Sequence, residues 1–119
     1  MNERLKREKL GRRAETLAAF YLRLKGYTIV ARRFKTPSGE IDIIAARRDL
    51  VIMIEVKARE HLQIARESIS MKSRKRVETA ARQFLSRQAR YQNYGIRFDA
   101  IFVIKGRKIV HEKDFWRTN

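Results

Sequence analysis

The chain has 119 residues, 44% of them hydrophobic, which is enough for one hydrophobic core but not for two. Its 29 Lys and Arg residues against 13 Asp and Glu give a net charge of +16 at pH 7, which indicates a polyanionic partner. The absence of Cys excludes disulfides, thiolate nucleophiles and Cys-based zinc sites, and two His residues cannot build a multi-His site in one chain. The sequence therefore predicts one domain over residues 1–119, with chemistry carried by carboxylates, Lys and hydroxyl groups.

The N-terminus and the hydropathy pattern predict where the protein resides. No stretch of about 18 continuous apolar residues is present, and the charged N-terminus lacks the apolar run of a signal peptide. We therefore expect a cytoplasmic protein with no membrane partner. Residues 1–7 are polar and basic, and we expect this segment to be mobile.

A helix and a strand are predicted first along the chain. Apolar residues recur at three- and four-residue intervals from about residue 8 to Lys25, and Gly26 stands where a helix would stop. Residues 27–34 are rich in β-branched and aromatic side chains, and residues 36–39 break this run as a turn. The first helix is therefore followed by a strand.

Two further strands form a predicted antiparallel hairpin. Residues 40–46 and 50–58 are strand-like runs, and the polar residues 47–49 connect them. The second run is apolar on both faces until Glu55, which is typical of a central, buried strand.

The rest of the chain predicts a second helix and two strands. Ser70 is a candidate N-cap for a helix that buries Val77 and its helical neighbours and ends before Gly95. Residues 96–104 predict a strand, residues 105–107 a turn, and residues 108–111 a short last strand. The third strand, second helix and fourth strand form a crossover, so these two strands should be parallel. The fold class is therefore α/β, with αβββαβ order and a mixed sheet flanked by helices.

Four charged side chains converge on the predicted hairpin. Because side chains alternate along a strand, Glu40 and Asp42 should share one side of the first strand, and Glu55 and Lys57 one side of the second. If the hairpin closes with a loop at residues 47–50, Asp42 lies opposite Glu55 and Glu40 opposite Lys57, with Cβ atoms roughly 5 Å apart.

Two carboxylates on a buried strand repel one another and need a cation. Mg²⁺, or Mn²⁺ in its place, takes one or two carboxylates together with waters and phosphate oxygens, which is the set that Asp42 and Glu55 offer. Lys57 could orient a metal-bound water or stabilise charge that develops on a phosphate. The alternative is a purely structural ion-pair network of Asp42, Glu55 and Lys57.

The same residues resemble a known superfamily. Gly-Glu-Ile-Asp at 39–42, followed by Ile-Glu-Val-Lys at 54–57, resembles the PD-(D/E)xK nucleases, which include restriction endonucleases and archaeal Holliday junction resolvases. More closely, residues 11–15, 39–45, 54–59 and 97–99 are similar to the YraN family of small, uncharacterised bacterial proteins.

The resemblance implies a restriction-endonuclease-like core and assigns roles to residues. Asp42 and Glu55 would bind metal, Lys57 would be the catalytic amine, and Glu15 would add a helix-borne acid to the metal site. Helical phasing places Glu15 beside Gly11 and Ala18, whose small size would permit close approach to the sheet. The alternative for Glu15 is an ordinary surface acid.

Basic residues around the hairpin and at the start of the second helix are candidate phosphate contacts, although a solvated charged face is the alternative. Arg59 follows Lys57 by two residues, so it should share the face of Lys57 and is the strongest single candidate. The other candidates are Arg32, Arg33, Lys35, Lys72, Arg74, Lys75 and Arg76. Three aromatic residues, Tyr91, Tyr94 and Trp116, are better explained by packing than by stacking on bases.

Three functional hypotheses follow. The leading one is a Mg²⁺-dependent endonuclease-type phosphodiesterase that acts on DNA, with a preference for branched or structured DNA implied by the resolvase resemblance. The second is a non-catalytic module that keeps the nuclease fold and binds nucleic acid or ribosomes through its basic surface. The third is a protein-interaction adaptor. The resemblance also implies a homodimer, but no apolar stripe in the sequence specifically predicts a dimer interface. The sequence does not distinguish DNA from RNA as the substrate.

Overall fold

The computed structural model describes residues 2–105 and 108–118. Their helices are α1 (Glu3–Leu24), α2 (Leu62–Glu67), α3 (Met71–Ser86) and the short 3₁₀ helix η1 (Ala89–Tyr91). The strands are β1 (Thr28–Thr36), β2 (Gly39–Arg47), β3 (Leu50–Arg59), β4 (Gly95–Ile104) and β5 (Lys108–Trp116). None of the helices described is both long and apolar enough to span a membrane.

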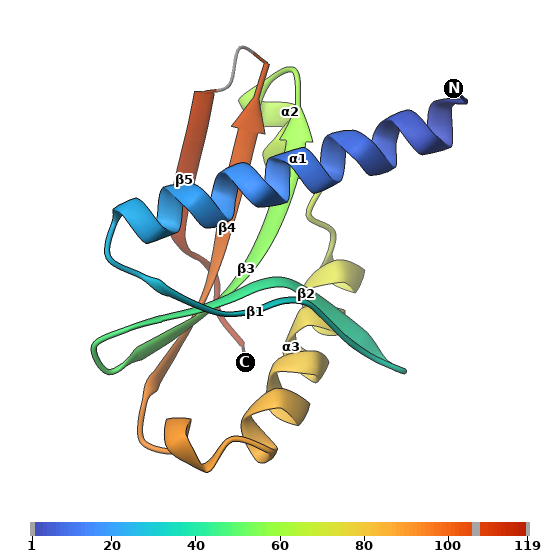
Figure 1. The fold of residues 1–119 in the computed structure, drawn as a ribbon. Coiled ribbons are helices and arrows are strands. Elements are labelled where there is room, and N and C mark those ends of the chain that lie inside the picture. Colours follow the sequence, from blue (N-terminus) through green and yellow to red (C-terminus); the bar gives the residue numbers. More distant parts are fainter. Residues whose placement is uncertain (1, 106–107, 119) are drawn as a thin grey trace.

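The strands form one mixed sheet in the order β1-β2-β3-β4-β5, so β3 is central as predicted (Figure 1). The β3–β4 pair is parallel, and the other three pairs are antiparallel. The predicted α/β class with a mixed sheet flanked by helices is confirmed, and it is compatible with a restriction-endonuclease-like core.

Helices cover both faces of the sheet and create two apolar clusters. Helix α1 lies across one face of the sheet (Figure 1). There it buries Ala18 and Leu22 against sheet residues such as Ile52. On the other face, α2 and α3 bury Ala65 and Phe84 in a larger cluster. Because β3 contributes to both clusters, its apolar side chains are covered on each side, which explains why its sequence shows no polar face before Glu55.

The structure corrects the predicted bounds at three places. Helix α1 begins at Glu3 rather than at about residue 8, and Asn2 caps it by accepting the Leu5 N–H at 2.8 Å. Helix α2 was not predicted, because its six residues bury only Ala65 and show no helical periodicity. Strand β5 continues to Trp116 instead of ending at residue 111. Its second half was not predicted, because it is polar and because Asp114, at φ 55°, interrupts the alternation of side chains. Gly106 and Arg107 of the predicted turn lie outside the described residues.

The buried side chain of Asp99 on β4 forms hydrogen bonds that hold β5 against the sheet. Its side chain has 0% exposure and accepts two hydrogen bonds from Arg97, each at 2.8 Å, and one from the Asp114 N–H at 2.9 Å. Nε2 of His111 also lies 2.8 Å from Asp99. Burial alone would raise the pKa of Asp99, but these hydrogen bonds outweigh it and lower the pKa to about 2. The cluster therefore keeps a charged carboxylate inside the fold.

Helix α3 and the β1–β2 turn meet closely at Gly39. A Cβ built on Gly39 would lie 2.0 Å from the backbone oxygen of Arg76, so only glycine fits there. At the start of α3, Ser70 is the N-cap as predicted and forms a reciprocal capping box with Ser73. These contacts fix the β1–β2 hairpin, and with it the acids that follow Gly39, relative to α3.

The predicted packing role of the three aromatic residues fits the structure. Tyr91 and Trp116 are buried, at 6% exposure each, and the Tyr94 ring packs edge-on against Tyr91. Trp116 also donates its indole N–H to Glu78 at 2.9 Å.

Candidate active site

The β2–β3 register brings the predicted acids together. Residues 43–47 pair with residues 50–54, which is the register that was predicted to place Asp42 opposite Glu55. The paired ladder ends there, and the Asp42 carboxylate accepts the Val56 N–H at 2.8 Å. The Asp42 side chain thus takes the place of a backbone partner where the two strands part.

The β1–β2 hairpin is also irregular at the position where β2 and β3 separate. Ile41 packs in the cluster on the α3 side together with Ile44, whereas Ile43 packs on the α1 side, so strict alternation fails around Asp42. On β1, Arg33 has φ 53°, a left-handed conformation that is unfavourable for a long side chain. These irregularities lie where the strands part.

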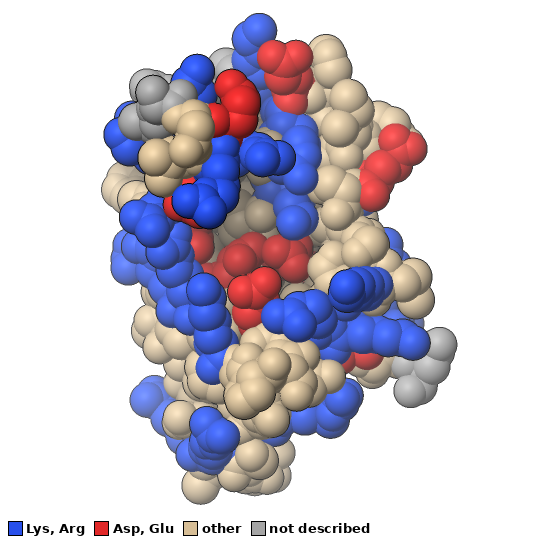
Figure 2. Space-filling model, turned by 90° about the vertical axis from the view of Figure 1, so that its right-hand side faces the viewer, with Lys and Arg blue, Asp and Glu red and all other residues tan. Residues whose placement is uncertain are grey.

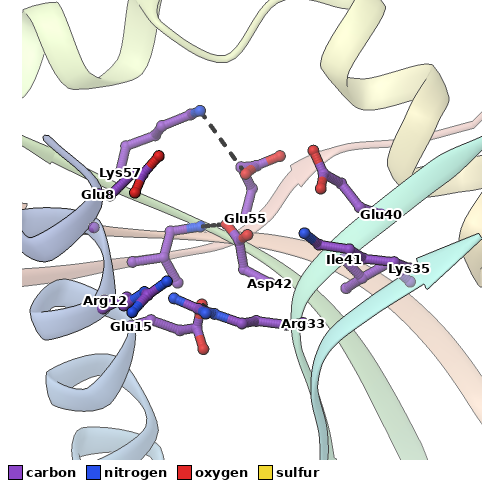
Figure 3. A pocket seen from close by; sticks show the side chains of 12 residues that line it. Glu8, Arg12, Glu15, Arg33, Lys35, Glu40, Ile41, Asp42, Glu55 and Lys57 are labelled. Atoms are coloured by element: carbon purple, nitrogen blue, oxygen red, sulfur yellow. Dashed lines mark hydrogen bonds and ion pairs between the residues drawn. The ribbon is translucent and has the colours of Figure 1, made fainter. Parts of the chain in front are cut away.

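A pocket of about 430 Å³ opens at this point, and we call it the acid pocket (Figure 3). It is formed by one face of α1 and by strands β1, β2 and β3. Among the described residues, five acids and four bases line it: Glu8, Glu15, Glu40, Asp42 and Glu55, with Arg12, Arg33, Lys35 and Lys57. Gly11, Ile41 and Val56 complete the lining.

Asp42, Glu55 and Lys57 form the centre of the acid pocket, as predicted from the strand pattern. Nζ of Lys57 lies 3.9 Å from the Glu55 carboxylate, and Glu55 as a whole is 8% exposed (Figure 3). Burial, followed by the charge of Asp42 and a hydrogen bond with it, raises the pKa of Glu55 from 4.5 to about 9, and Lys57 opposes this only partly. Without a further cation, Glu55 therefore holds a proton at neutral pH.

The donor set fits a hard divalent cation. Within residues 2–105 and 108–118, no group of three or more His, Cys, Asp or Glu side chains is placed to hold a metal ion. Mg²⁺, however, is commonly bound by one or two carboxylates with waters and phosphate oxygens, and Asp42 and Glu55 offer such a pair. The raised pKa of Glu55 is consistent with this fit, because burial and the charge of Asp42 disfavour a second carboxylate there unless a cation is bound.

Glu15 lines the acid pocket, but its carboxylate is already paired with two arginines. It is 5% exposed, so it is not an ordinary surface acid. Its two oxygens accept hydrogen bonds from Nε of Arg32 at 3.1 Å and from Nε of Arg33 at 3.2 Å. Glu15 thus holds the strained Arg33 at the pocket wall, and its part in a metal site stays a prediction.

Most of the basic residues predicted to contact phosphates lie in several different cavities. Arg33 and Lys35 line the acid pocket, and Glu40 at its rim lies 4.0 Å from Arg76. Lys72, Lys75 and Arg76 line a shallow depression at the start of α3.

Two other predicted basic residues lie outside the acid pocket. Arg74 is turned away, with its guanidinium over the rings of Phe115 and Trp116. Arg59 lines a neighbouring groove rather than the pocket of Lys57, although both residues belong to β3.

Sequence reasoning predicted Glu15 of α1 at the site but missed two other residues of the same helix. Glu8 and Arg12 both line the acid pocket, and together with Glu15 they are spaced by four and three residues, which is one face of a helix. That polar stripe beside the apolar one was a signal that could have been used. The expected role of Gly11 was wrong, because a Cβ there would meet nothing within 4 Å. Gly11 faces open space in the acid pocket instead of the sheet.

The charge distribution around the acid pocket is uneven. Figure 2 shows a hollow with acidic residues at its centre and basic residues along both sides. A negative centre within a positive surround suits a polyanion that approaches through its phosphates while a cation mediates contact with the acids.

Comparison with known proteins places the chain in a family. The model of the uncharacterised protein family UPF0102 matches residues 14–103. A UPF0102 protein of Chelativorans sp. is 50% identical over 89% of this chain and 86% of its own length. A second from Mesorhizobium japonicum is 50% identical over 98% of this chain and 94% of its length. A third from Parvibaculum lavamentivorans is 43% identical over 92% of this chain and 82% of its length. These matches confirm the resemblance to the YraN family.

Proposed function

The chain belongs to the uncharacterised protein family UPF0102, and we propose that it is a divalent-metal-dependent nuclease that hydrolyses phosphodiester bonds in nucleic acid. One observation carries the proposal: Asp42 and Glu55 share an open pocket with the Lys57 amine 3.9 Å from Glu55. A structural ion-pair network would match its charges. Here burial, and after it the charge of Asp42, raises the pKa of Glu55 to about 9, and Lys57 opposes this only partly, so the lysine does not balance the two acids.

Each residue of the acid pocket has a distinct task in this proposal. Asp42 and Glu55 would hold Mg²⁺ or Mn²⁺, which when bound lowers the pKa of a coordinated water and neutralises phosphate charge. Lys57 would donate a hydrogen bond to the phosphate or orient the attacking water. Arg33 and Lys35, on the opposite wall, would bind the phosphates that flank the reacting one.

The proposed substrate is DNA, with branched or structured DNA the first class to test. The net charge of +16 supports a nucleic acid of either kind, and the preference for branched DNA rests on the resolvase resemblance. A panel of single-stranded, duplex, flapped and four-way DNA, with RNA counterparts, would rank these substrates under one metal concentration.

The decisive experiment is a metal-titrated cleavage assay on this panel. Asp42→Asn and Lys57→Ala should each lose cleavage by a factor of about 100 or more, because the first removes a metal ligand and the second removes the amine that acts on the phosphate or the attacking water. Glu67→Gln and Lys113→Ala are matched controls, since both residues are exposed and lie outside the acid pocket. Cleavage that persists in both the Asp42→Asn and the Lys57→Ala variant would refute the proposal.

A non-catalytic binding module is the second candidate. The observation that favours it is the pairing of Glu15 with Arg32 and Arg33, which leaves two acids rather than three free for a metal. Calorimetry with Mg²⁺ and Mn²⁺ separates the candidates. No heat of metal binding, together with salt-sensitive nucleic-acid binding that Asp42→Asn leaves unchanged, would favour the module.

A further inference from the structure

A second and larger cavity lies beside the acid pocket, between α1 and the C-terminal ends of β3 and β4. Its volume is about 930 Å³, against about 430 Å³ for the acid pocket. We call it the α1 groove. Nothing in the proposed metal chemistry uses it, so it needs an explanation of its own.

The α1 groove combines an apolar floor with a cationic rim. Leu10, Leu17 and Ile104 contribute to the floor, and Leu10 is 53% exposed, so this apolar surface is open to a ligand. Among the described residues that line it, four are basic and one is acidic: Arg12, Arg13, Arg59 and Lys105, with Glu60. Glu60 already faces Lys105 at 3.7 Å, so the arginines are left to a negatively charged occupant.

The α1 groove is continuous with the acid pocket. Arg12 lines both cavities, so it stands at their junction. On β3, Lys57 lines the acid pocket and Arg59 lines the groove, and two residues of a strand span about 7 Å. A chain molecule that leaves the acid pocket along β3 would therefore enter the groove directly.

We propose that the α1 groove binds one unpaired strand of nucleic acid and leads it toward the acid pocket. The arginines would contact phosphates, and the apolar floor would contact base faces. An unpaired strand exposes those faces, whereas a duplex keeps its bases stacked inside and would leave Leu10 and Ile104 without partners. The strand's direction toward cleavage rests on the proposed function, but its binding does not require cleavage.

The test measures binding of a fluorescent oligothymidylate of about 12 nucleotides in the presence of a chelator, by anisotropy over a range of salt concentrations. Arg13→Ala with Arg59→Ala should weaken binding about tenfold and reduce the salt slope by about 1.4, since each lost contact with a single strand contributes about 0.7. The matched control is Arg87→Ala with Lys113→Ala, which removes the same charge from exposed positions outside the α1 groove.

A third variant tests the floor of the groove. Leu10→Gln keeps a helix-forming residue at an exposed position and should weaken binding several-fold without changing the salt slope, because it removes no charge. Circular dichroism would verify that each variant is folded. A matching duplex should be affected no more by the groove variants than by the control pair.

Any of three outcomes in the binding and association assays would overturn the inference. These are equal losses in the groove and control pairs, equal losses for duplex and single strand, or self-association that Leu10→Gln abolishes while oligothymidylate binding persists. The last would assign the groove to a second copy of the chain. Cleavage retained in the double groove variant with no loss of oligothymidylate binding also refutes the groove alone. Groove-dependent binding without any metal-dependent cleavage would refute the proposed nuclease and leave the groove standing.

Discussion

Replacing Glu55 by glutamine should stabilise the metal-free protein, and the gain should grow with pH. The pKa of Glu55 is about 9 in the fold against an ordinary value of 4.5, because burial and Asp42 disfavour its charged form. Between these values the folded protein keeps a proton that the unfolded chain releases. The stability of the wild-type protein must therefore fall as pH rises through this window.

The magnitude follows from the same two values. One pKa unit corresponds to about 1.4 kcal/mol, so at pH 7 the wild type is destabilised on the order of 3 kcal/mol relative to pH 4 by Glu55 alone. A glutamine side chain has no such proton to keep, and its amide can donate to Asp42 as the protonated acid does. Glu55→Gln should accordingly raise the unfolding temperature at pH 7 by roughly 10 °C and change it little near pH 4.5.

Thermal unfolding followed by circular dichroism between pH 4.5 and 8.5, with chelator present, measures this difference. Glu67→Gln is the matched control, because Glu67 is exposed and should give a small shift at every pH. A Glu55→Gln variant less stable than wild type above pH 7, or a difference that does not change with pH, would refute the account of the acid pocket given above.

Three further predictions address the metal, the hairpin and the buried acid. Titration of Mg²⁺ or Mn²⁺ near pH 7 should release close to one proton per ion, seen as a buffer-dependent heat, and Glu55→Gln should abolish the release. Gly39→Ala should cost about 2 kcal/mol in chemical denaturation, because its Cβ would overlap the Arg76 backbone. Asp99→Asn should cost about 3 kcal/mol at pH 7 and much less near pH 2, since the pKa of Asp99, lowered to about 2, makes its contribution disappear as pH falls.

The pattern of the strands predicted the centre of the site but not its walls. A hairpin loop at residues 47–50 fixes the register by counting, so the meeting of Asp42 with Glu55 followed from the sequence. The family resemblance implied Glu15 of α1, but the other α1 residues of the pocket did not follow, because the angle at which a helix crosses a sheet depends on packing of the whole fold. The spacing of Glu8 and Arg12 from Glu15 places the three on one helix face, but that angle decides that this face borders the acid pocket.

The fold was predictable where periodicity is regular and failed where it is interrupted. The central strand β3 has a continuous apolar run, and its bounds were predicted to within one residue. Arg59 was predicted to lie beside Lys57, because strict alternation assigns both residues to one face of the strand. Arg59 is the last residue of β3, however, and lines a separate groove beside α1. Sequence alternation predicts the side of a strand and carries no information on where one cavity ends.

Three local departures from favourable structure lie at the acid pocket, although left-handed backbone at non-glycine residues also occurs at Arg48 and Asp114, outside it. Arg33 adopts a left-handed backbone conformation, which costs on the order of 1 kcal/mol or more. Gly11 lies within α1 where alanine would fit and stabilise the helix by about 0.5 to 1 kcal/mol, since nothing contacts its side-chain position. Glu55 keeps a proton at neutral pH beside Asp42.

None of the three is needed to pack the core, and a structural ion-pair network would gain stability by losing each of them. Together they keep a cavity open, hold a guanidinium at its wall and leave two carboxyl groups short of positive charge. Stability given up at three places around one cavity is what a binding site for a cation and an anionic ligand would require. These departures add to the arrangement of Asp42, Glu55 and Lys57 as support for the nuclease proposal over a purely structural ion-pair network.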